Sequence, residues 1–131
     1  MIETPVRVDV MGAPVDVLTI GQTVELAAQY AEADKFAHFI GVNADKLLQM
    51  RDNQEMDSIV RRCEVVNADG ASMVMAAHCL GIDLPERVTG IDLMYELCAM
   101  AANRGMGVFL LGAKQDVVED TSRKLRELYP T

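Results

Sequence analysis

The chain has 131 residues, of which half are hydrophobic and 5% are aromatic, so it is long enough for one domain with a real core. This composition favours an α/β or α protein over an aromatic-rich β-sandwich. Twelve Lys and Arg residues stand against 20 Asp and Glu residues, and the net charge of −8 argues against general nucleic-acid binding, which needs a basic surface. An acidic domain can still bind an anionic nucleotide through helix N-termini and a few placed arginines.

Cysteine spacing and hydropathy predict the compartment. Cys63, Cys79 and Cys98 show no CxxC spacing and each lies in an apolar stretch, so we expect buried free thiols in a reducing compartment. The N-terminal residues do not read as a signal peptide, and nothing approaches the ~18 consecutive apolar residues of a membrane-spanning helix. The sequence therefore predicts a cytosolic chain.

The first half of the chain predicts a hairpin followed by alternating helices and strands. Apolar and polar residues alternate on both sides of the turn Gly12-Ala13-Pro14, as in a β-hairpin. Thr23 is a plausible N-cap for the helix that follows. The predicted elements are strands over residues 6–10 and 15–18, a helix over 24–33, a strand over 36–42, a helix around 47–50 and a short helix over 56–62.

The second half continues the alternation. We expect a strand over residues 63–66, a buried helix over 71–80, a loop over 81–89, a helix over 90–103, a strand over 108–111 covered on both faces, and a helix over 115–129. The last helix should turn Val117, Val118, Thr121, Leu125 and Leu128 inward. Such alternation predicts βαβ crossovers, a mainly parallel sheet and helices on both of its faces.

Two polar residues follow predicted strands, where open α/β folds place ligands. Asp69 lies between a strand and a helix, and Gly70 after it permits a tight turn or a close ligand approach. Asp69 is either an N-cap worth ~1 kcal/mol or a functional carboxylate. A functional carboxylate should point into a cleft instead of folding back on residues 70–72. Asn43 has the same two interpretations, a turn residue or cap and a site residue.

Further candidates lie in the loops. Arg87 is either solvated or placed to bind a diphosphate bidentately, and Glu86 could simply pair with it. Asp92 is a first-turn helix acid or a sugar ligand, and Thr89 could cap its helix. The turn Gly112-Ala113-Lys114-Gln115 has the form of a nucleotide contact, although it lacks both GxGxxG and GxxxxGK[ST]. The two histidines lack partners at ligand spacing, so we expect no metal site and no cofactor.

One ordered set of motifs carries a family resemblance. Asn67-Ala68-Asp69-Gly70, then an apolar helix, then LPERVTGIDL over residues 84–93, resembles the bacterial WecG/TagA/CpsF glycosyltransferases. The resemblance implies a Rossmann-like three-layer α/β sandwich, with a mainly parallel sheet, behind the N-terminal β-hairpin. It also implies that residues 1–131 are one glycosyltransferase domain that lacks the family's C-terminal segment.

The activity implied by the resemblance is inverting transfer of an N-acetylmannosamine-type sugar from a UDP donor to a polyprenyl-diphosphate-linked sugar, in cell-wall (teichoic acid) or surface-polysaccharide synthesis. Asp69 would be the catalytic base. The residues expected to bind substrate are Asn43, Asn67, Gly70, Arg87, Asp92, Gly112 and Gln115. The family tends to have a Thr-x-Asn-x-Glu-like pattern where this chain has Gly41-Val42-Asn43-Ala44-Asp45, so Gly41 replaces a threonine.

The resemblance also sets expectations for partners. They are the UDP-sugar, the lipid-linked acceptor and, through a segment absent here, peripheral contact with the inner face of the cell membrane; a homo-oligomer is a further expectation. Two alternatives stay open. In the first, the chain is a nucleotide-sugar-binding module that is inactive without further residues. In the second, it is a fragment of a nucleotide-binding oxidoreductase, which the lack of the GxGxxG motif disfavours.

Overall fold

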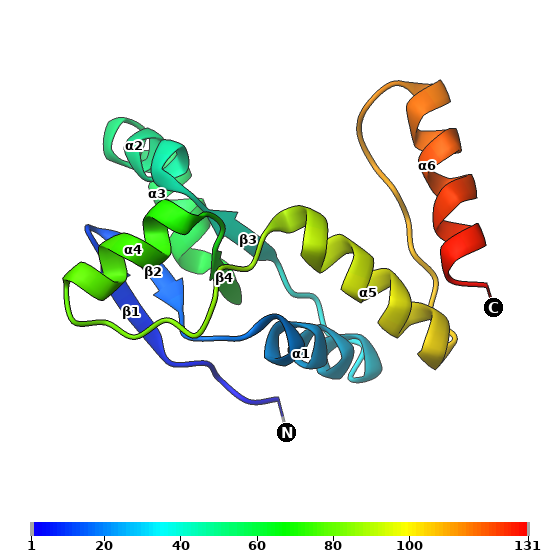
Figure 1. Ribbon diagram of the computed structural model, residues 1–131, viewed down its shortest axis with the longest axis horizontal. Coiled ribbons are helices and arrows are strands. Elements are labelled where there is room, and N and C mark those ends of the chain that lie inside the picture. Colours follow the sequence, from blue (N-terminus) through cyan, green and yellow to red (C-terminus); the bar gives the residue numbers. More distant parts are fainter. Residues whose placement is uncertain (1, 131) are drawn as a thin grey trace. The chain divides into compact units, whose positions relative to one another are not determined.

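The computed structural model describes residues 2–130, which divide into two compact units, residues 2–93 and residues 94–130. Figure 1 shows the elements of each unit along the chain. The helix α5 (Gly90–Arg104) begins in the first unit and continues in the second. The candidate residues between Gly41 and Asp92 belong to the first unit.

The N-terminal hairpin is confirmed. Strands β1 (Arg7–Val10) and β2 (Ala13–Asp16) pair antiparallel, with Arg7 opposite Asp16. Met11 and Gly12 form the two-residue turn and both have positive φ, 54° and 92°, as a type I′ turn requires. The turn expected at Gly12-Ala13-Pro14 was therefore placed one residue late, because Ala13 and Pro14 already belong to β2.

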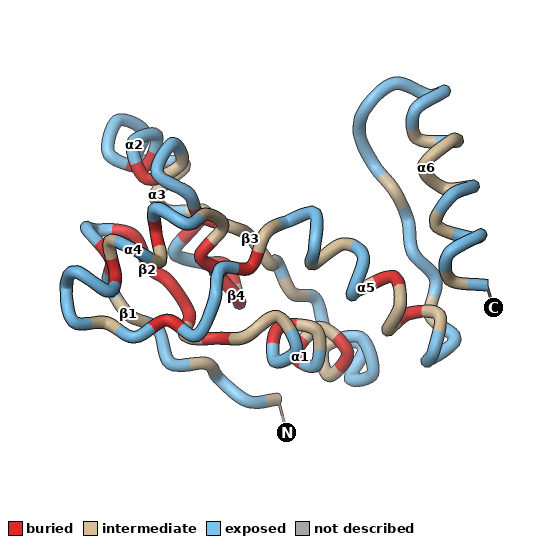
Figure 2. Tube along the Cα trace, in the orientation of Figure 1, coloured by how far each residue is buried: buried red, intermediate tan, exposed pale blue. Residues whose placement is uncertain are grey.

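A parallel pair of strands forms the centre of the first unit (Figure 1). Strands β3 (Phe39–Val42) and β4 (Val65–Ala68) are joined by the helices α2 (Ala44–Asp52) and α3 (Gln54–Arg62), which makes the predicted crossover. Gly41 lies opposite Asn67, and Val42 lies opposite Ala68. Burial concentrates in β2 and β4, whose residues are all buried (Figure 2), and the fully buried valines of the hairpin and the parallel pair are Val10, Val15, Val42, Val65 and Val66.

A buried carboxylate joins the hairpin to this pair of strands. Asp16 is 2% exposed, and its Oδ2 accepts a 2.7 Å hydrogen bond from the backbone N–H of Val66 in β4. The same carboxylate accepts bonds of 2.8 and 2.9 Å from the Arg7 guanidinium, which raises the pKa of Arg7. The Asp16 side chain therefore supplies, from the hairpin, the acceptor for a backbone N–H of β4.

Helix α1 (Ile20–Glu32) begins four residues before the predicted start, because its N-cap is Thr19 and not Thr23. Thr19 Oγ1 accepts from the N–H of Gln22, and Gln22 Oε1 accepts from the N–H of Thr19, which completes a capping box. Thr23 is fully buried, and its hydroxyl donates to the carbonyl of Thr19. Its burial shows a packing role that the sequence pattern did not indicate.

Helix α4 (Ala71–Cys79) lies where the sequence predicted it, but the expectation of a buried helix was wrong, because only Met73 and Ala77 are buried and Met75 is 66% exposed. Its final residue Cys79 is exposed, so the expectation of three buried thiols was wrong for this one. Cys63 and Cys98 are buried and free, and burial raises the pKa of both thiols.

The second unit differs most from the prediction. Residues 108–111 form no strand, and Phe109 and Leu111 are 86% and 91% exposed, so the expected strand covered on both faces was wrong. An extended apolar run becomes a strand only where a neighbouring strand accepts its backbone hydrogen bonds, and none within residues 2–130 does so. Helix α6 (Gln115–Leu128) follows as predicted but buries none of its side chains, including Val117 and Leu128, which were expected to point inward (Figure 2).

The α/β class and the hairpin are thus confirmed, whereas the parallel sheet within residues 2–130 has two strands. A Rossmann-like three-layer sandwich over a larger parallel sheet stays a prediction. Among the same residues, no helix combines the length and the apolar character needed to cross a membrane.

Candidate functional site

The candidate site lies where β3 and β4 end. Parallel strands end at the same edge of a sheet, and Asn43 follows β3 as Asp69 follows β4. The N–H of Asp69 donates to the carbonyl of Val42 at 2.9 Å, which continues the pairing one residue past β4. A β-carbon added to Gly70 would lie 3.7 Å from the Asn43 Cβ, so the residues after the two strands lie close together.

Asn43 is the N-cap of α2. Its Oδ1 accepts a 2.9 Å hydrogen bond from the N–H of Lys46, and the residue is exposed. The cap interpretation is therefore confirmed, and a contact of Asn43 with substrate stays a prediction.

Asp69 does not cap α4. The N-cap is Gly70, at φ 144° and ψ 144°, a conformation that favours glycine, and no described side chain caps this helix. The Asp69 side chain lies against Gly41 instead, so that a β-carbon on Gly41 would be 3.0 Å from Asp69 Oδ2. Asp69 is half-buried, and within residues 2–130 no hydrogen bond or ion pair engages its carboxylate. The capping interpretation of Asp69 is contradicted.

Asn67 faces the interior. It is 2% exposed, and its Nδ2 donates to Thr23 Oγ1 at 3.0 Å, which ties β4 to α1. Its Oδ1 is buried and has no hydrogen-bond partner in the described chain. The structure gives Asn67 a role in holding β4, and its expected contact with substrate stays a prediction.

The loop after α4 returns to the same sheet edge, because the N–H of Val88 donates to the carbonyl of Ala68 at 2.8 Å. Glu86 does not pair with Arg87. Its Oε1 accepts from the N–H of Ile20 at 2.8 Å, at the start of α1. The Arg87 side chain is exposed, and no hydrogen bond or ion pair to another residue of the described chain occupies it.

Thr89 caps α5, as the sequence predicted. Its Oγ1 accepts a 3.2 Å hydrogen bond from the N–H of Asp92. Asp92 is exposed in the first turn of the helix, where a carboxylate is favourable next to the helix dipole. Its side chain is accessible for a sugar contact, which stays a prediction.

An open cleft of about 390 Å³ lies between α4 and the loop that carries Arg87. Ala71, the first residue of α4, lines it together with Arg87, and so do His78 and Asp83, which sequence reasoning did not select. The remaining lining is apolar and comes from Val74, Met75 and Leu84. The polar residues were missed because they stand singly in apolar surroundings and match no ligand spacing.

Two expected substrate residues belong to the second unit. Gly112 has φ 123° and Gln115 begins α6, with its Nε2 donating to Glu119 Oε1 at 2.9 Å. Both residues are exposed. They keep the form of a turn that exposes backbone groups, and their contact with a nucleotide stays a prediction.

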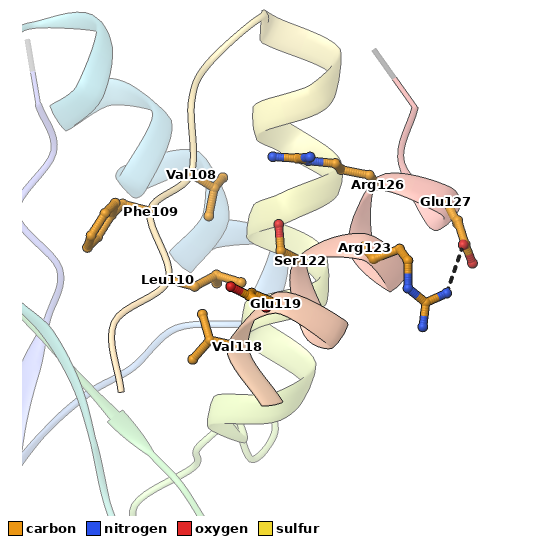
Figure 3. A pocket seen from close by; sticks show the side chains of 9 residues that line it. All are labelled: Val108, Phe109, Leu110, Val118, Glu119, Ser122, Arg123, Arg126 and Glu127. Carbon is orange, nitrogen blue, oxygen red and sulfur yellow. Dashed lines mark hydrogen bonds and ion pairs between the residues drawn. The ribbon is translucent and has the colours of Figure 1, made fainter. Parts of the chain in front are cut away.

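The second unit also holds an open cavity of about 760 Å³ between the extended segment and α6 (Figure 3). Leu110 and Val118 meet inside it, whereas Phe109 lies on the side of the segment away from α6. Arg123 is engaged by Glu127 at 3.3 Å and also by Asp120. None of the expected site residues lines this cavity.

Among residues 2–130, no three or more His, Cys, Asp or Glu side chains are grouped as a metal ion would need.

Comparison with known protein families identifies a match that covers nearly the whole chain. The model of the Glycosyl transferase WecG/TagA/CpsF family matches residues 8–131, which is almost the whole chain. This match includes the Asp69 turn, the α4 helix and the loop of Arg87, whose arrangement at one sheet edge is described above. The chain belongs to the WecG/TagA/CpsF family of glycosyltransferases.

Proposed function

We propose that this glycosyltransferase is inverting and moves an N-acetylmannosamine-type sugar from a UDP donor to a polyprenyl-diphosphate-linked sugar, in cell-wall or surface-polysaccharide synthesis. Family membership supports the glycosyl transfer. The observation that carries the mechanism is the position of Asp69. Its carboxylate is half-buried at the sheet edge and is not consumed by the helix cap that its sequence position suggested.

In the proposed reaction, a hydroxyl oxygen of the acceptor sugar attacks the anomeric carbon of the donor. The new C–O bond forms as the bond from that carbon to the diphosphate oxygen breaks, and UDP leaves with the bonding electrons from the opposite face. Asp69 accepts the hydroxyl proton during the attack. One displacement of this kind inverts the anomeric configuration.

The negative charge that grows on the leaving diphosphate needs donors. Arg87 and the first residue of α4 line the same cleft, and the α4 N-terminus is left without a side-chain cap. An arginine fork together with free N–H groups at a helix N-terminus suits a diphosphate. We therefore assign the diphosphate to Arg87 and to the backbone after Gly70.

The remaining expected contacts complete the proposal. Asn43, which follows β3, and Asp92, in the first turn of α5, are exposed and would hydrogen-bond sugar hydroxyls. Gly112 and Gln115 would contact the nucleotide. Because the proposed acceptor is linked to a lipid, the proposal places the transfer reaction at the inner face of the cell membrane.

The first experiment is calorimetric titration of UDP and UDP-N-acetylmannosamine into the full chain, with and without EDTA. We expect binding that survives EDTA and weakens in Arg87→Ala, because Arg87 would hold the diphosphate. Arg62→Ala is the matched control, since it removes the same charge from an exposed arginine of α3 that bonds its own helix. Equal weakening in both variants would contradict the assignment of Arg87.

The second experiment measures sugar transfer to a polyprenyl-diphosphate-linked acceptor. Asp69→Asn should lower kcat by ~10²–10⁴ because the amide cannot accept the proton. Asp52→Asn, at an exposed aspartate that ends α2, is the control and should keep full activity. Full transfer by Asp69→Asn would refute the base assignment. Binding of UDP without any turnover by the unmodified chain would favour the nucleotide-sugar-binding module instead.

A further inference from the structure

We propose that Glu86 is a positioning residue for Arg87, because its hydrogen bond to the start of α1 fixes the loop that carries the arginine. The inference rests on the proposed function, in which Arg87 binds the diphosphate of the donor. Glu86 itself does not line the cleft that Arg87 lines, so its role in binding is indirect.

The hydrogen bond of Glu86 completes the start of α1. Ile20 is the first residue of this helix, so its N–H has no partner within the helix. The capping box between Thr19 and Gln22 engages the N–H groups of those two residues and not that of Ile20. Glu86 Oε1 accepts the Ile20 N–H at 2.8 Å from 66 positions along the chain. A carboxylate is also favourable at the positive end of the helix dipole, so two effects hold the loop to the helix.

The residues on both sides of Arg87 are fixed, whereas its own side chain is not. The N–H of Val88 donates to the carbonyl of Ala68 in β4 at 2.8 Å, and Val88 is 2% exposed. Glu86 makes the bond on the other side. Arg87 is exposed, and within residues 2–130 no other residue engages its side chain. Its position therefore depends on the bonds of its two neighbours.

Helix α1 is also bonded to the strand that leads to Asp69. Thr23 Oγ1, in the first turn of the helix, accepts a 3.0 Å hydrogen bond from Asn67 Nδ2, and both residues are buried. Asn67 lies in β4, two residues before Asp69. The first turn of α1 thus bonds the strand of the proposed base through Thr23 and the loop of Arg87 through Ile20. These two bonds fix the arginine relative to the base.

The first test removes the acceptor and measures UDP binding by calorimetry. Glu86→Ala should raise the Kd for UDP by about 2- to 10-fold, the cost of ordering a loosely held side chain on binding. Glu86→Gln keeps an oxygen acceptor and should restore most of the affinity. Glu55→Ala, at an exposed glutamate in the first turn of α3, is the matched control and should leave the Kd unchanged. The same loss in Glu86→Gln as in Glu86→Ala would overturn the inference.

The second test removes the donor and leaves the loop sequence intact. Ile20→Pro deletes the N–H at the first helical position, where proline is favourable, and Thr19 before it already has an extended backbone at φ −79° and ψ 166°. This variant should weaken UDP binding as Glu86→Ala does, and the two changes together should weaken it no further. Ile20→Val, which keeps the N–H, is its control. Unchanged affinity in Ile20→Pro would overturn the inference, and this variant carries the remaining tests if Glu86→Ala fails to fold.

A double-mutant cycle shows whether Glu86 acts through Arg87. In the Arg87→Ala background, Glu86→Ala should change the Kd for UDP little, because the side chain that it positions is gone. A role in helix stability alone would not depend on Arg87. An equal effect of Glu86→Ala in both backgrounds would therefore overturn the inference.

Hydrogen exchange separates the inference from the proposed function, because it needs no ligand. Glu86→Ala should speed exchange of the Val88 N–H, whereas Arg87→Ala should not. If the chain binds no UDP, or if Arg87→Ala binds it as tightly as the unmodified chain, the diphosphate assignment fails, and exchange still decides whether Glu86 fixes the loop. If Arg87→Ala weakens binding while Glu86→Ala changes neither affinity nor exchange, only the positioning role fails.

Discussion

The bond between Arg7 and Asp16 allows the most specific stability prediction. The Asp16 side chain is 0% exposed and accepts three hydrogen bonds, two from the Arg7 guanidinium and one from the N–H of Val66. The Arg7 side chain is 32% exposed and also donates to the carbonyls of Arg61 and Cys63. Removing the Arg7 side chain therefore leaves the buried Asp16 carboxylate without its counter-ion. Removing the Asp16 side chain leaves the Arg7 guanidinium, which can reach water and still donates to the carbonyls of Arg61 and Cys63.

This asymmetry sets the expected order. Arg7→Met should lower the free energy of unfolding by ~3–5 kcal/mol, the range for a buried ion pair broken from one side. Asp16→Ala should cost ~2–3 kcal/mol, chiefly because the N–H of Val66 loses its acceptor in a buried environment. The removal of the more exposed partner thus costs more than the removal of the buried one. The double variant should cost less than the sum of the two.

The assay is urea unfolding followed by far-UV circular dichroism, since the chain has no Trp to report by fluorescence. Arg123→Met is the control, because its partners Asp120 and Glu127 lie on the exposed face of α6, and it should cost under ~1 kcal/mol. A loss below ~1 kcal/mol for Arg7→Met, or strict additivity in the double variant, would refute the reasoning.

Three further predictions concern single positions. Asp34 follows Ala33, the C-cap of α1, and has φ 53°, so Asp34→Gly should raise the free energy of unfolding by ~0.5–1 kcal/mol in thermal unfolding, and a loss would contradict the conformation. Asn43→Ala should cost ~1 kcal/mol by loss of the α2 cap, whereas Asn43→Ser should recover most of it. At pH 8, Cys79 should react first with a thiol reagent in mass-spectrometric mapping, because it is exposed while burial raises the pKa of Cys63 and Cys98. Equal labelling of all three cysteines at pH 8 would contradict the expected order of reactivity. The raised pKa values of Cys63 and Cys98 favour the neutral thiol in the folded state. The stability that they contribute is therefore complete below about pH 8.5, the usual thiol pKa, and is lost as the pH rises through the raised values.

The sequence predicted elements well where the pattern was local. The hairpin and the helices follow from alternation and from helical spacing, which depend on residues close together in the chain. The start of α1 was misplaced because Thr19 and Thr23 are both good caps, and only the reciprocal bond with Gln22 selects the first. Neither residue type nor spacing could show that Thr23 is instead the partner of Asn67.

The strand expected over residues 108–111 failed for a different reason. The apolar run favours burial and an extended backbone, but a strand also needs a neighbouring strand for its backbone hydrogen bonds. That neighbour is a property of the tertiary structure, and Phe109 and Leu111 are exposed. Apolar character alone therefore predicts what a segment prefers, not the partner that satisfies the preference.

The candidate site shows the same limit at single residues. Asn43 and Asp69 both follow a parallel strand and precede a helix, and each could be a cap or a functional group. The structure separates them, because Asn43 bonds the first turn of α2 while Asp69 lies over Gly41 and does not cap α4. The Asp69 side chain lies against Gly41 on the neighbouring strand, 28 positions earlier in the chain, and sequence spacing does not reveal such a neighbour. In the proposed reaction, a carboxylate that caps no helix is the group available as a base, and Asp69 meets this condition whereas the Asn43 side chain is occupied by its cap.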